Sequence, residues 1–190
     1  TIKAVPPYCI KQGADVNGQG LDGLTVLMWA LSCENSAGIE ALLKAGSNPN
    51  LRSRTGITAV YAAATNRNPD YLRLILKYGG DPNGAPDKDG DTAVWAAMGR
   101  GFDNDQWDNY HALLNAGLDI NKPARGSSSI ADIAMTFRQP GLVVDLIDRG
   151  FKFDPEKLAF QIYQSAFEDE GNRHQDLRKL IEIVKSRGVD

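Results

Sequence analysis

The sequence predicts an all-α solenoid of paired antiparallel helices, on the evidence of a repeat and of the pattern inside each repeat. Six glycines mark the repeat, because they close helix-like segments and stand 33, 33, 38, 33 and 38 residues apart. They are Gly13, Gly46, Gly79, Gly117, Gly150 and Gly188. A fixed period of this length, with two apolar helical stripes in each period, predicts helix pairs that bury their faces on neighbouring pairs.

Residues 21–50 show the pattern of one repeat most clearly. Asp22 and Gly23 form a turn signal, because glycine tolerates the positive φ of tight turns. Thr25 is placed to cap the following helix, and Gly46 stands where a second helix often ends in a left-handed residue. The apolar stripes of the two helices are Val26, Leu27, Ala30 and Leu31, then Ile39, Leu42 and Leu43. The stretch therefore predicts a hairpin turn, two helices and a closing turn.

The opening of the first helix recurs four times and carries a family resemblance. The segments are TVLMWA (25–30), TAVYAA (58–63), TAVWAA (92–97) and SIADIA (129–134). With the period of 33, they resemble the T-P-L-H-x-A pattern of ankyrin repeats over nearly the whole chain. The usual histidine is replaced by Met28, Tyr61, Trp95 and Asp132, so the hydrogen bonds of that histidine are not expected in the first and third repeats.

The resemblance implies a single ankyrin-repeat domain over residues 1–190. We expect full repeats with β-hairpin or turn loops at 18–50, 51–83, 84–121 and 122–153. A partial amino-terminal repeat occupies 1–17, with its helix at about 7–12, and a divergent capping repeat occupies 154–190. In the last repeat, helices are expected from Pro155 to about Glu168 and from His174 to Ser186, the second with many charges on its outer face.

The third repeat is five residues longer than the period of 33. One extra residue fits in the 84–89 hairpin, and we place the other four between its two helices at about 101–110. In this segment three aromatic residues alternate with three aspartates. One interpretation is a longer surface turn, in which Trp107 and Tyr110 cover the next helix. The alternatives are a contact for a partner protein and a calcium loop, although Asp103, Asp105 and Asp108 lack the spacing and glycine of known calcium loops.

Composition and motifs disfavour several kinds of chemistry. The net charge is −3 without a basic run, which argues against nucleic acid. The longest apolar runs are six residues, as in Val26–Leu31, so no transmembrane segment is expected.

Motifs for catalysis and metal binding are also lacking in the sequence. Two cysteines, Cys9 and Cys33, are too few for a disulfide framework, and a bond between them is not expected. The serines at 127–129 have no nearby histidine, and Asp87–Asp91 is interpreted as turn chemistry. We expect no enzyme, no cofactor and no metal.

The ankyrin resemblance implies binding through the hairpin tips and the exposed edges of the first helices, which together form a concave face. The candidate partner-binding residues are Trp29, Arg52, Arg54, Lys88, Arg100, Phe102, Trp107, Tyr110, Arg125 and Phe137. The hairpin tips are basic in a chain with net negative charge, and this separation of charge would steer an acidic protein surface. The sequence does not distinguish a concave interface from one at the insertion.

The sequence therefore predicts a non-catalytic protein-binding module, monomeric when free. The Leu-Met-Trp-Ala opening, the divergent end and the incomplete start are similar to bacterial exported ankyrin proteins. Some of these are immunity proteins that occlude a toxic effector enzyme such as a secreted lipase, and others are accessories to oxidative-stress enzymes. An intracellular adaptor that holds partner proteins together is the alternative.

The resemblance to exported proteins also concerns location. It implies a periplasmic or membrane-anchored protein, and a cytoplasmic location is the alternative. We expect residues before Thr1 in the parent protein, as a removed signal peptide, a lipid-anchor segment or further repeats.

Overall fold

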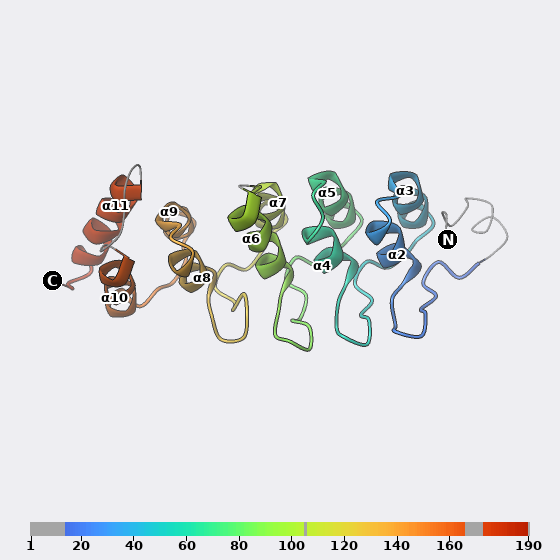
Figure 1. The fold of residues 1–190 in the computed structure, drawn as a ribbon, viewed down its shortest axis with the longest axis horizontal. Helices are drawn as coiled ribbons and strands as arrows, with labels where there is room; N and C mark the ends of the chain where they lie inside the picture. Colours follow the sequence, from blue (N-terminus) through green and yellow to red (C-terminus); the bar gives the residue numbers. More distant parts are fainter. Residues whose placement is uncertain (1–13, 105, 166–172, 190) are drawn as a thin grey trace. The chain divides into compact units, whose positions relative to one another are not determined.

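Helices joined by loops make up the computed structural model, which describes residues 14–104, 106–165 and 173–189 (Figure 1). The helices are α2 (Val26–Ser32), α3 (Ser36–Lys44), α4 (Ala59–Ala64), α5 (Pro69–Lys77), α6 (Ala93–Asn104), α7 (Asp108–Asn115), α8 (Ile130–Thr136), α9 (Pro140–Asp148), α10 (Pro155–Ser165) and α11 (Arg173–Lys185). Two isolated β-bridges pair Gln19 with Thr25 and Asp91 with Arg125. The predicted all-α fold of antiparallel helix pairs is confirmed. The number of repeats and the division into domains stay predictions.

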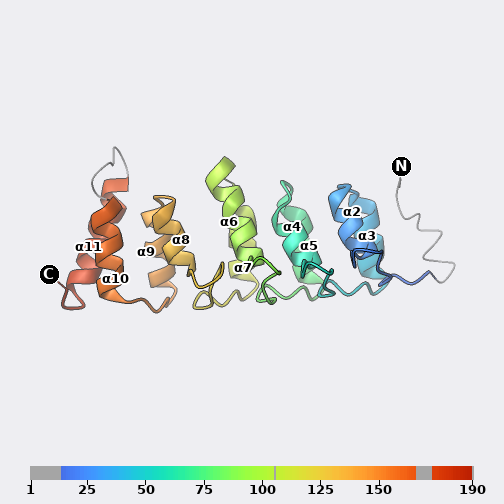
Figure 2. The ribbon, with the colours of Figure 1, turned by 60° about the horizontal axis from the view of Figure 1, so that its bottom comes forward.

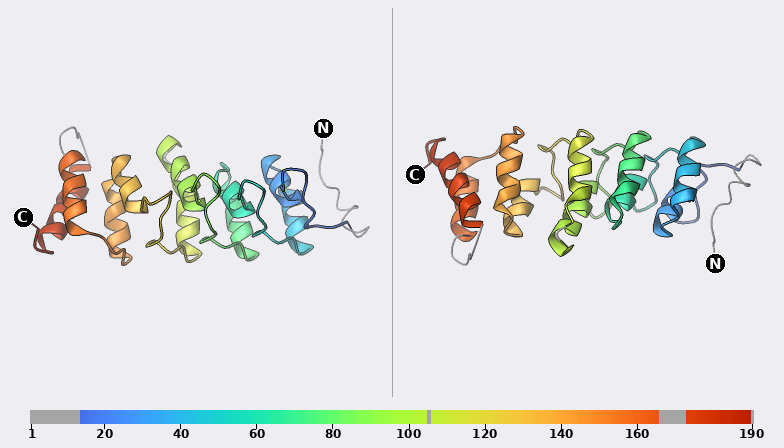
Figure 3. Two further views of the ribbon diagram at one scale, coloured as in Figure 1. Left: turned by 90° about the horizontal axis from the view of Figure 1, so that it is seen from below. Right: turned by 90° about the horizontal axis from the view of Figure 1, so that it is seen from above.

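The described residues form two compact units. Unit 1 comprises the residues up to Asp119 together with Ala124–Gly126, and unit 2 comprises Ile120–Pro123 and the residues from Ser127 on. In unit 1 the first helices of the pairs, α2, α4 and α6, pack in one row, and the second helices, α3, α5 and α7, pack in another. Figures 2 and 3 show these two rows of unit 1 from further directions.

The core of unit 1 lies between its two rows of helices. Leu27 and Leu31 of α2 are 0% and 1% exposed, and Ile39 of α3 and Leu72 of α5 are both 0% exposed. Burying a side chain of this size stabilises a fold by about 1.5–3 kcal/mol. The helices of unit 2 pack in the same way as those of unit 1. Helix α8 packs on α9 and α10 packs on α11 within the pairs, and α8 contacts α10 and α9 contacts α11 between the pairs.

The helix starts predicted from the sequence are confirmed. The hydroxyl oxygen of Thr25 accepts a hydrogen bond from the N–H of Met28 at 3.2 Å, and Thr58 and Ser129 cap α4 and α8 in the same way. The closing glycines also behave as expected. Gly46, Gly79, Gly117, Gly150 and Gly188 have φ between 86° and 91°, which is the left-handed region that favours glycine.

The insertion in the third repeat is helical, which corrects the prediction of a longer turn. Helix α6 has 12 residues, whereas α2 has seven and α4 has six. The extra residues therefore add more than one turn to the end of α6, and α7 begins at Asp108 shortly afterwards. Alanine and methionine at the start of α6 favour this continuation, and Gly101 is accommodated inside the helix.

Some predictions fall outside the described residues. The amino-terminal half-repeat is described only from Ala14 on, so its expected helix and Cys9 lie outside this part of the chain. Helix α10 ends at Ser165 in the described part, three residues before the predicted end, and residues 166–172 are not described. Helix α11 begins and ends one residue earlier than predicted. None of the helices in the described residues is long and apolar enough to span a membrane.

Glu34 follows α2 in a conformation that disfavours a side chain, since its φ is 52°. We expect Glu34→Gly to raise the free energy of unfolding by about 0.5–1 kcal/mol, because glycine adopts positive φ without steric cost. The control is Arg67→Gly, which is equivalent because each residue stands nine positions after its cap, Thr25 or Thr58. Arg67 does not have a positive φ, so that substitution should be destabilising. Urea unfolding of both variants tests this, and equal effects would contradict it.

Candidate functional site

The first helices of unit 1 expose one row of side chains. In α2, Leu27 and Leu31 point into the core, and Trp29 lies halfway between them in sequence, so it points away from the core and is 43% exposed. Cys33, at the end of the same helix, is also exposed and has a free thiol. Trp29 is therefore exposed, and its role in binding stays a prediction.

The loops between the helix pairs of unit 1 are joined by backbone hydrogen bonds, which we call the loop ladder. The N–H of Arg54 donates to the carbonyl of Asp22 at 3.0 Å, and the N–H of Lys88 donates to the carbonyl of Thr55 at 2.9 Å. The N–H of Gly126 donates to the carbonyl of Gly90 at 3.0 Å. Each loop is thus held against the one before it, and these loops extend from the same side of unit 1 (Figure 1).

Arg54 and Lys88 present free cationic groups on these loops. Both residues are exposed, and within the described residues neither side chain makes a hydrogen bond or an ion pair. Their backbone groups are fixed by the loop ladder, so the two charges extend from ordered loops.

Two other predicted arginines, Arg52 and Arg100, form hydrogen bonds inside unit 1. Arg52 donates from Nη1 to the carbonyl of Ala85 at 2.7 Å and from Nη2 to the carbonyl of Pro86 at 2.6 Å. Arg100 donates from Nε to the carbonyl of Thr65 at 2.7 Å. These side chains tie one helix pair to the next.

Arg125 belongs to a cluster of aromatic and charged side chains. Its Nε lies 2.7 Å from Oδ1 of Asp91, and its guanidinium carbon lies 4.7 Å from the centroid of the Trp95 ring. Burial raises the pKa of Tyr61 above its ordinary value, and the negative charges of Asp91 and Asp87 raise it further. The phenol of Tyr61 therefore resists ionisation even more than a free tyrosine does, and the contacts of Arg125 with Asp91 and Trp95 are formed within unit 1.

The aromatic residues of the insertion pack on each other. The ring of Trp107 meets Phe102 edge-on at 5.2 Å between centroids and Tyr110 at 6.0 Å. Tyr110 is 0% exposed, so its inclusion among the surface residues was wrong. Phe102 and Trp107 are half-buried. Trp107 rests on Gly101 of the preceding helix α6, whereas the surface-turn interpretation expected it to cover the next helix.

A shallow hollow of about 240 Å³ lies at the ends of α2 and α4. Leu31, Ser32 and Ala62 line it, together with Arg67 and Arg100. Arg67 is exposed, and its side chain has no hydrogen bond or ion pair among the described residues. The hollow thus adds a cation to the edge of the first helices that the sequence analysis did not include.

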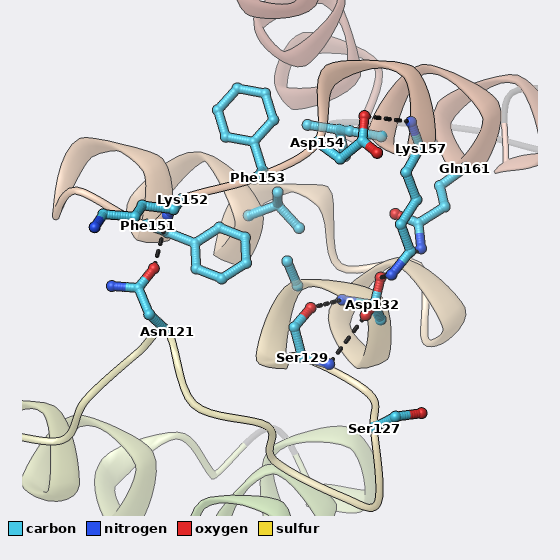
Figure 4. A pocket seen from close by; sticks show the side chains of 13 residues that line it. Asn121, Ser127, Ser129, Asp132, Phe151, Lys152, Phe153, Asp154, Lys157 and Gln161 are labelled. Carbon is cyan, nitrogen blue, oxygen red and sulfur yellow. Dashed lines mark hydrogen bonds and ion pairs between the residues drawn. The ribbon is translucent and has the colours of Figure 1, made fainter.

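Unit 2 has its own polar centre at Asp132 (Figure 4). Oδ1 of Asp132 lies 2.6 Å from Nζ of Lys157 and accepts from Nε2 of Gln161 at 2.9 Å, and Oδ2 accepts from the N–H of Ser129 at 2.9 Å. Burial raises the pKa of this carboxyl, but these hydrogen bonds outweigh burial and lower it to about 2. Asp132 therefore connects α8 to α10.

Phe137, the last predicted surface residue, ends α8 in unit 2. It is 44% exposed, close to the 43% of Trp29 in unit 1. Phe160 of α10 is more exposed, at 61%, and it stands midway between the buried Leu158 and Ile162. The sequence analysis missed Phe160, although its spacing between two buried positions is the same signal that marks Trp29.

The serine and aspartate motifs noted in the sequence serve local structure in the described residues. The Ser129 hydroxyl accepts the N–H of Asp132 at 3.1 Å, which is the helix cap predicted for the serines at 127–129. Oδ1 of Asp87 accepts the N–H groups of Asp89 and Asp91, which is turn chemistry as predicted. In the described parts of the chain, no three or more His, Cys, Asp or Glu side chains gather where they could hold a metal ion.

Comparison with known proteins agrees with the helix pairs and loops described above. Residues 34–124 match a family model described as ankyrin repeats (3 copies). No curated protein matches the chain. This family is generally non-catalytic and works by contact with other proteins. Residues 34–124 are therefore ankyrin repeats, and they indicate a protein–protein interaction module.

Proposed function

We propose that the chain binds another protein through the first helices and loops of unit 1 and catalyses no reaction itself. The observation that carries this proposal is the exposed Trp29 on a helix whose neighbouring apolar residues are buried. Tryptophan and arginine are the residues that most often anchor protein interfaces. Arg54 and Lys88 add free positive charges on loops that the loop ladder orders.

The partner that this surface favours is an acidic protein surface. Arg54, Lys88 and Arg67 are cations without an internal partner among the described residues, and they lie on loops or helix ends of unit 1. Complementary charge would speed association and set the orientation of the complex. The resemblance to exported bacterial ankyrin proteins favours a toxic effector enzyme, whose active site the chain would cover.

The first test is binding with matched charge variants. Arg54→Glu/Lys88→Glu should weaken capture of the partner by about tenfold or more, and Trp29→Ala should do the same. Lys44→Glu/Lys77→Glu makes the same change in charge on α3 and α5, in the other row of helices, and should leave capture within about twofold. The source-cell proteins retained by the chain would be identified and the affinity measured by calorimetry. Equal loss in both double variants would contradict a local interface.

The same captured partner separates inhibition from adaptor function. If the partner is an enzyme, one equivalent of the chain should abolish its activity, and the Arg54→Glu/Lys88→Glu variant should fail to do so. Retained activity in a stable complex would exclude occlusion. Simultaneous capture of two different proteins would instead support the alternative of an intracellular adaptor.

A further inference from the structure

Unit 2 lacks a loop that the helix pairs of unit 1 have. In unit 1, α4 starts at Ala59, 13 residues after the closing Gly46, and α6 starts at Ala93, 14 residues after Gly79. In unit 2, α10 starts at Pro155, only five residues after Gly150. The chain therefore passes directly from α9 to α10, and no projecting loop precedes α10 (Figure 1).

The missing loop leaves an acceptor without a donor. In the loop ladder, the carbonyl of Gly90 accepts a hydrogen bond from the following loop, and Gly90 stands two residues before the cap Thr92. Ser127 matches Gly90, the last acceptor of the ladder, because it stands two residues before the cap Ser129, whereas Asp22 and Thr55 stand three residues before theirs. Among the described residues, no hydrogen bond reaches the carbonyl of Ser127, which is exposed.

A hollow of about 220 Å³ lies beside this acceptor, within unit 2 (Figure 4). Its apolar lining is Ala131, Val143, Phe151 and Leu158. Ser127 lies on its rim with Lys152, Asp154 and Lys157, and the polar residues Asn121, Ser129, Asp132 and Gln161 also line it. Asn121, Asp132 and Gln161 already hydrogen-bond within unit 2, so the volume and the apolar part of the lining suit one aliphatic or aromatic side chain.

The charges around this hollow balance. Lys157 forms an ion pair with Asp132 at 2.6 Å, and Lys152 and Asp154 are both exposed, one of each sign. An arriving group would therefore meet no net charge to pair with. A neutral apolar side chain fits these surroundings better than an acid or a base.

We propose that this hollow binds an extended segment of a partner protein, which takes the place of the missing loop. One backbone N–H of the segment donates to the carbonyl of Ser127, as the next loop does in unit 1, and the apolar side chain beside it enters the hollow. This is addition of an extended strand to an open edge, where backbone hydrogen bonds give affinity and a pocket gives specificity. The site shares no residue with the Trp29 surface of unit 1, so either proposal can fail without the other.

The direct test is an NMR titration of the intact ¹⁵N-labelled chain with acetyl-Gly-Ser-Val-Leu-Val-Ser-Gly-amide. Binding should shift the amides of Ser127, Ser128, Phe153 and Lys157 and saturate at roughly millimolar peptide. Two further peptides carry an N-methyl group on the leucine or on the following valine. Successive N–H groups of an extended chain point to opposite sides, so one of these peptides should bind at least about fivefold more weakly and the other should be unaffected.

Variants of the chain add a second readout. Ala131→Leu fills the hollow and should weaken the parent peptide by about tenfold or more, whereas Lys152→Ala on the rim should change it by less than about twofold. If Ala131→Leu does not fold, the pair of N-methylated peptides still decides the matter. Equal binding of both N-methylated peptides, or shifts confined to the Trp29 surface, would overturn the proposal. Shifts of these amides that grow with protein concentration alone would also overturn it, because a second copy of the chain would then occupy the hollow.

Discussion

Gly101→Ala is expected to lower the free energy of unfolding by about 2 kcal/mol, although alanine is the better helix former by about 1 kcal/mol. Gly101 lies inside α6, and the ring of Trp107 rests directly on it. A Cβ at this position would meet the ring atoms Cε3, Cζ3 and Cδ2 well inside 3.0 Å. To make room, Trp107 would have to leave its edge-on contacts with Phe102 and Tyr110.

A second glycine of the same helix provides the matched control. Gly99 has no atom within 4 Å of the place where its Cβ would stand, so Gly99→Ala should raise stability by about 0.5–1 kcal/mol. Urea unfolding followed by tryptophan fluorescence reports on both, because Trp29, Trp95 and Trp107 all lie in unit 1. The double variant Gly101→Ala/Trp107→Leu should recover part of the loss. Stabilisation by Gly101→Ala alone would show that the ring moves at little cost.

The contact between Trp107 and Gly101 also explains why the helical form of the insertion could not be predicted from the sequence. Extra residues after a helix are compatible with a loop or with a longer helix, and a glycine such as Gly101 favours the loop. The outcome depends on Trp107, which needs a surface without a side chain and finds it at Gly101 on the added turn. That preference arises from a contact between residues six apart across a helix end, which no periodic pattern records.

Features that depend on a residue and on those next to it in the sequence were predictable. Thr25 caps α2 and Gly46 ends its repeat at positive φ because each local conformation depends on the residue itself. The period of 33 then predicted the helix pairs, since equal spacing lets each pair bury the same face on its neighbours.

Which side chains of the candidate surface are free and exposed was less predictable. Arg52 and Arg54 look equivalent in the sequence, but Arg52 donates to two carbonyls of the next loop, whereas the side chain of Arg54 makes no such bond within the described residues. Which cation is free depends on loop-to-loop geometry over more than 30 residues. Tyr110 likewise could not be distinguished from its exposed neighbours by composition, although the structure buries it.

Asp132→Ala is expected to destabilise unit 2 by about 2 kcal/mol, because it removes a helix cap and two contacts between α8 and α10 together. The backbone N–H of Ser129 loses its acceptor, and Lys157 and Gln161 of α10 lose theirs. A helix cap contributes about 1 kcal/mol, and the bond to a half-buried charge contributes at least as much. Far-UV circular dichroism during urea unfolding is the suitable measurement, because the tryptophans of the chain all lie in unit 1.

The contribution of the Asp132 charge should disappear in acid. Its pKa falls from 3.8 to about 2 in the folded chain, so the folded state favours the ionised carboxylate. A lowered pKa of this kind adds stability above about pH 4, by about 1–2 kcal/mol once the partial exposure of the group is taken into account. That stability is lost as the pH falls from about 4 towards 2, where the folded chain also binds the proton.

Asp132→Asn isolates this charge, since the amide keeps nearly the same shape. The difference in unfolding free energy between the unmodified chain and Asp132→Asn should be constant from pH 5 to 7 and shrink by about 1–2 kcal/mol between pH 4 and 2. Asp145→Asn removes another aspartate of unit 2, one that forms a largely exposed ion pair with Arg149. The side chains of Arg149 and Asp145 are 43% and 39% exposed, so this substitution should lower the free energy of unfolding by at most about 0.5 kcal/mol at pH 7. A difference for Asp132→Asn that does not change with pH would mean that hydrogen-bond geometry, and not charge, joins α8 to α10.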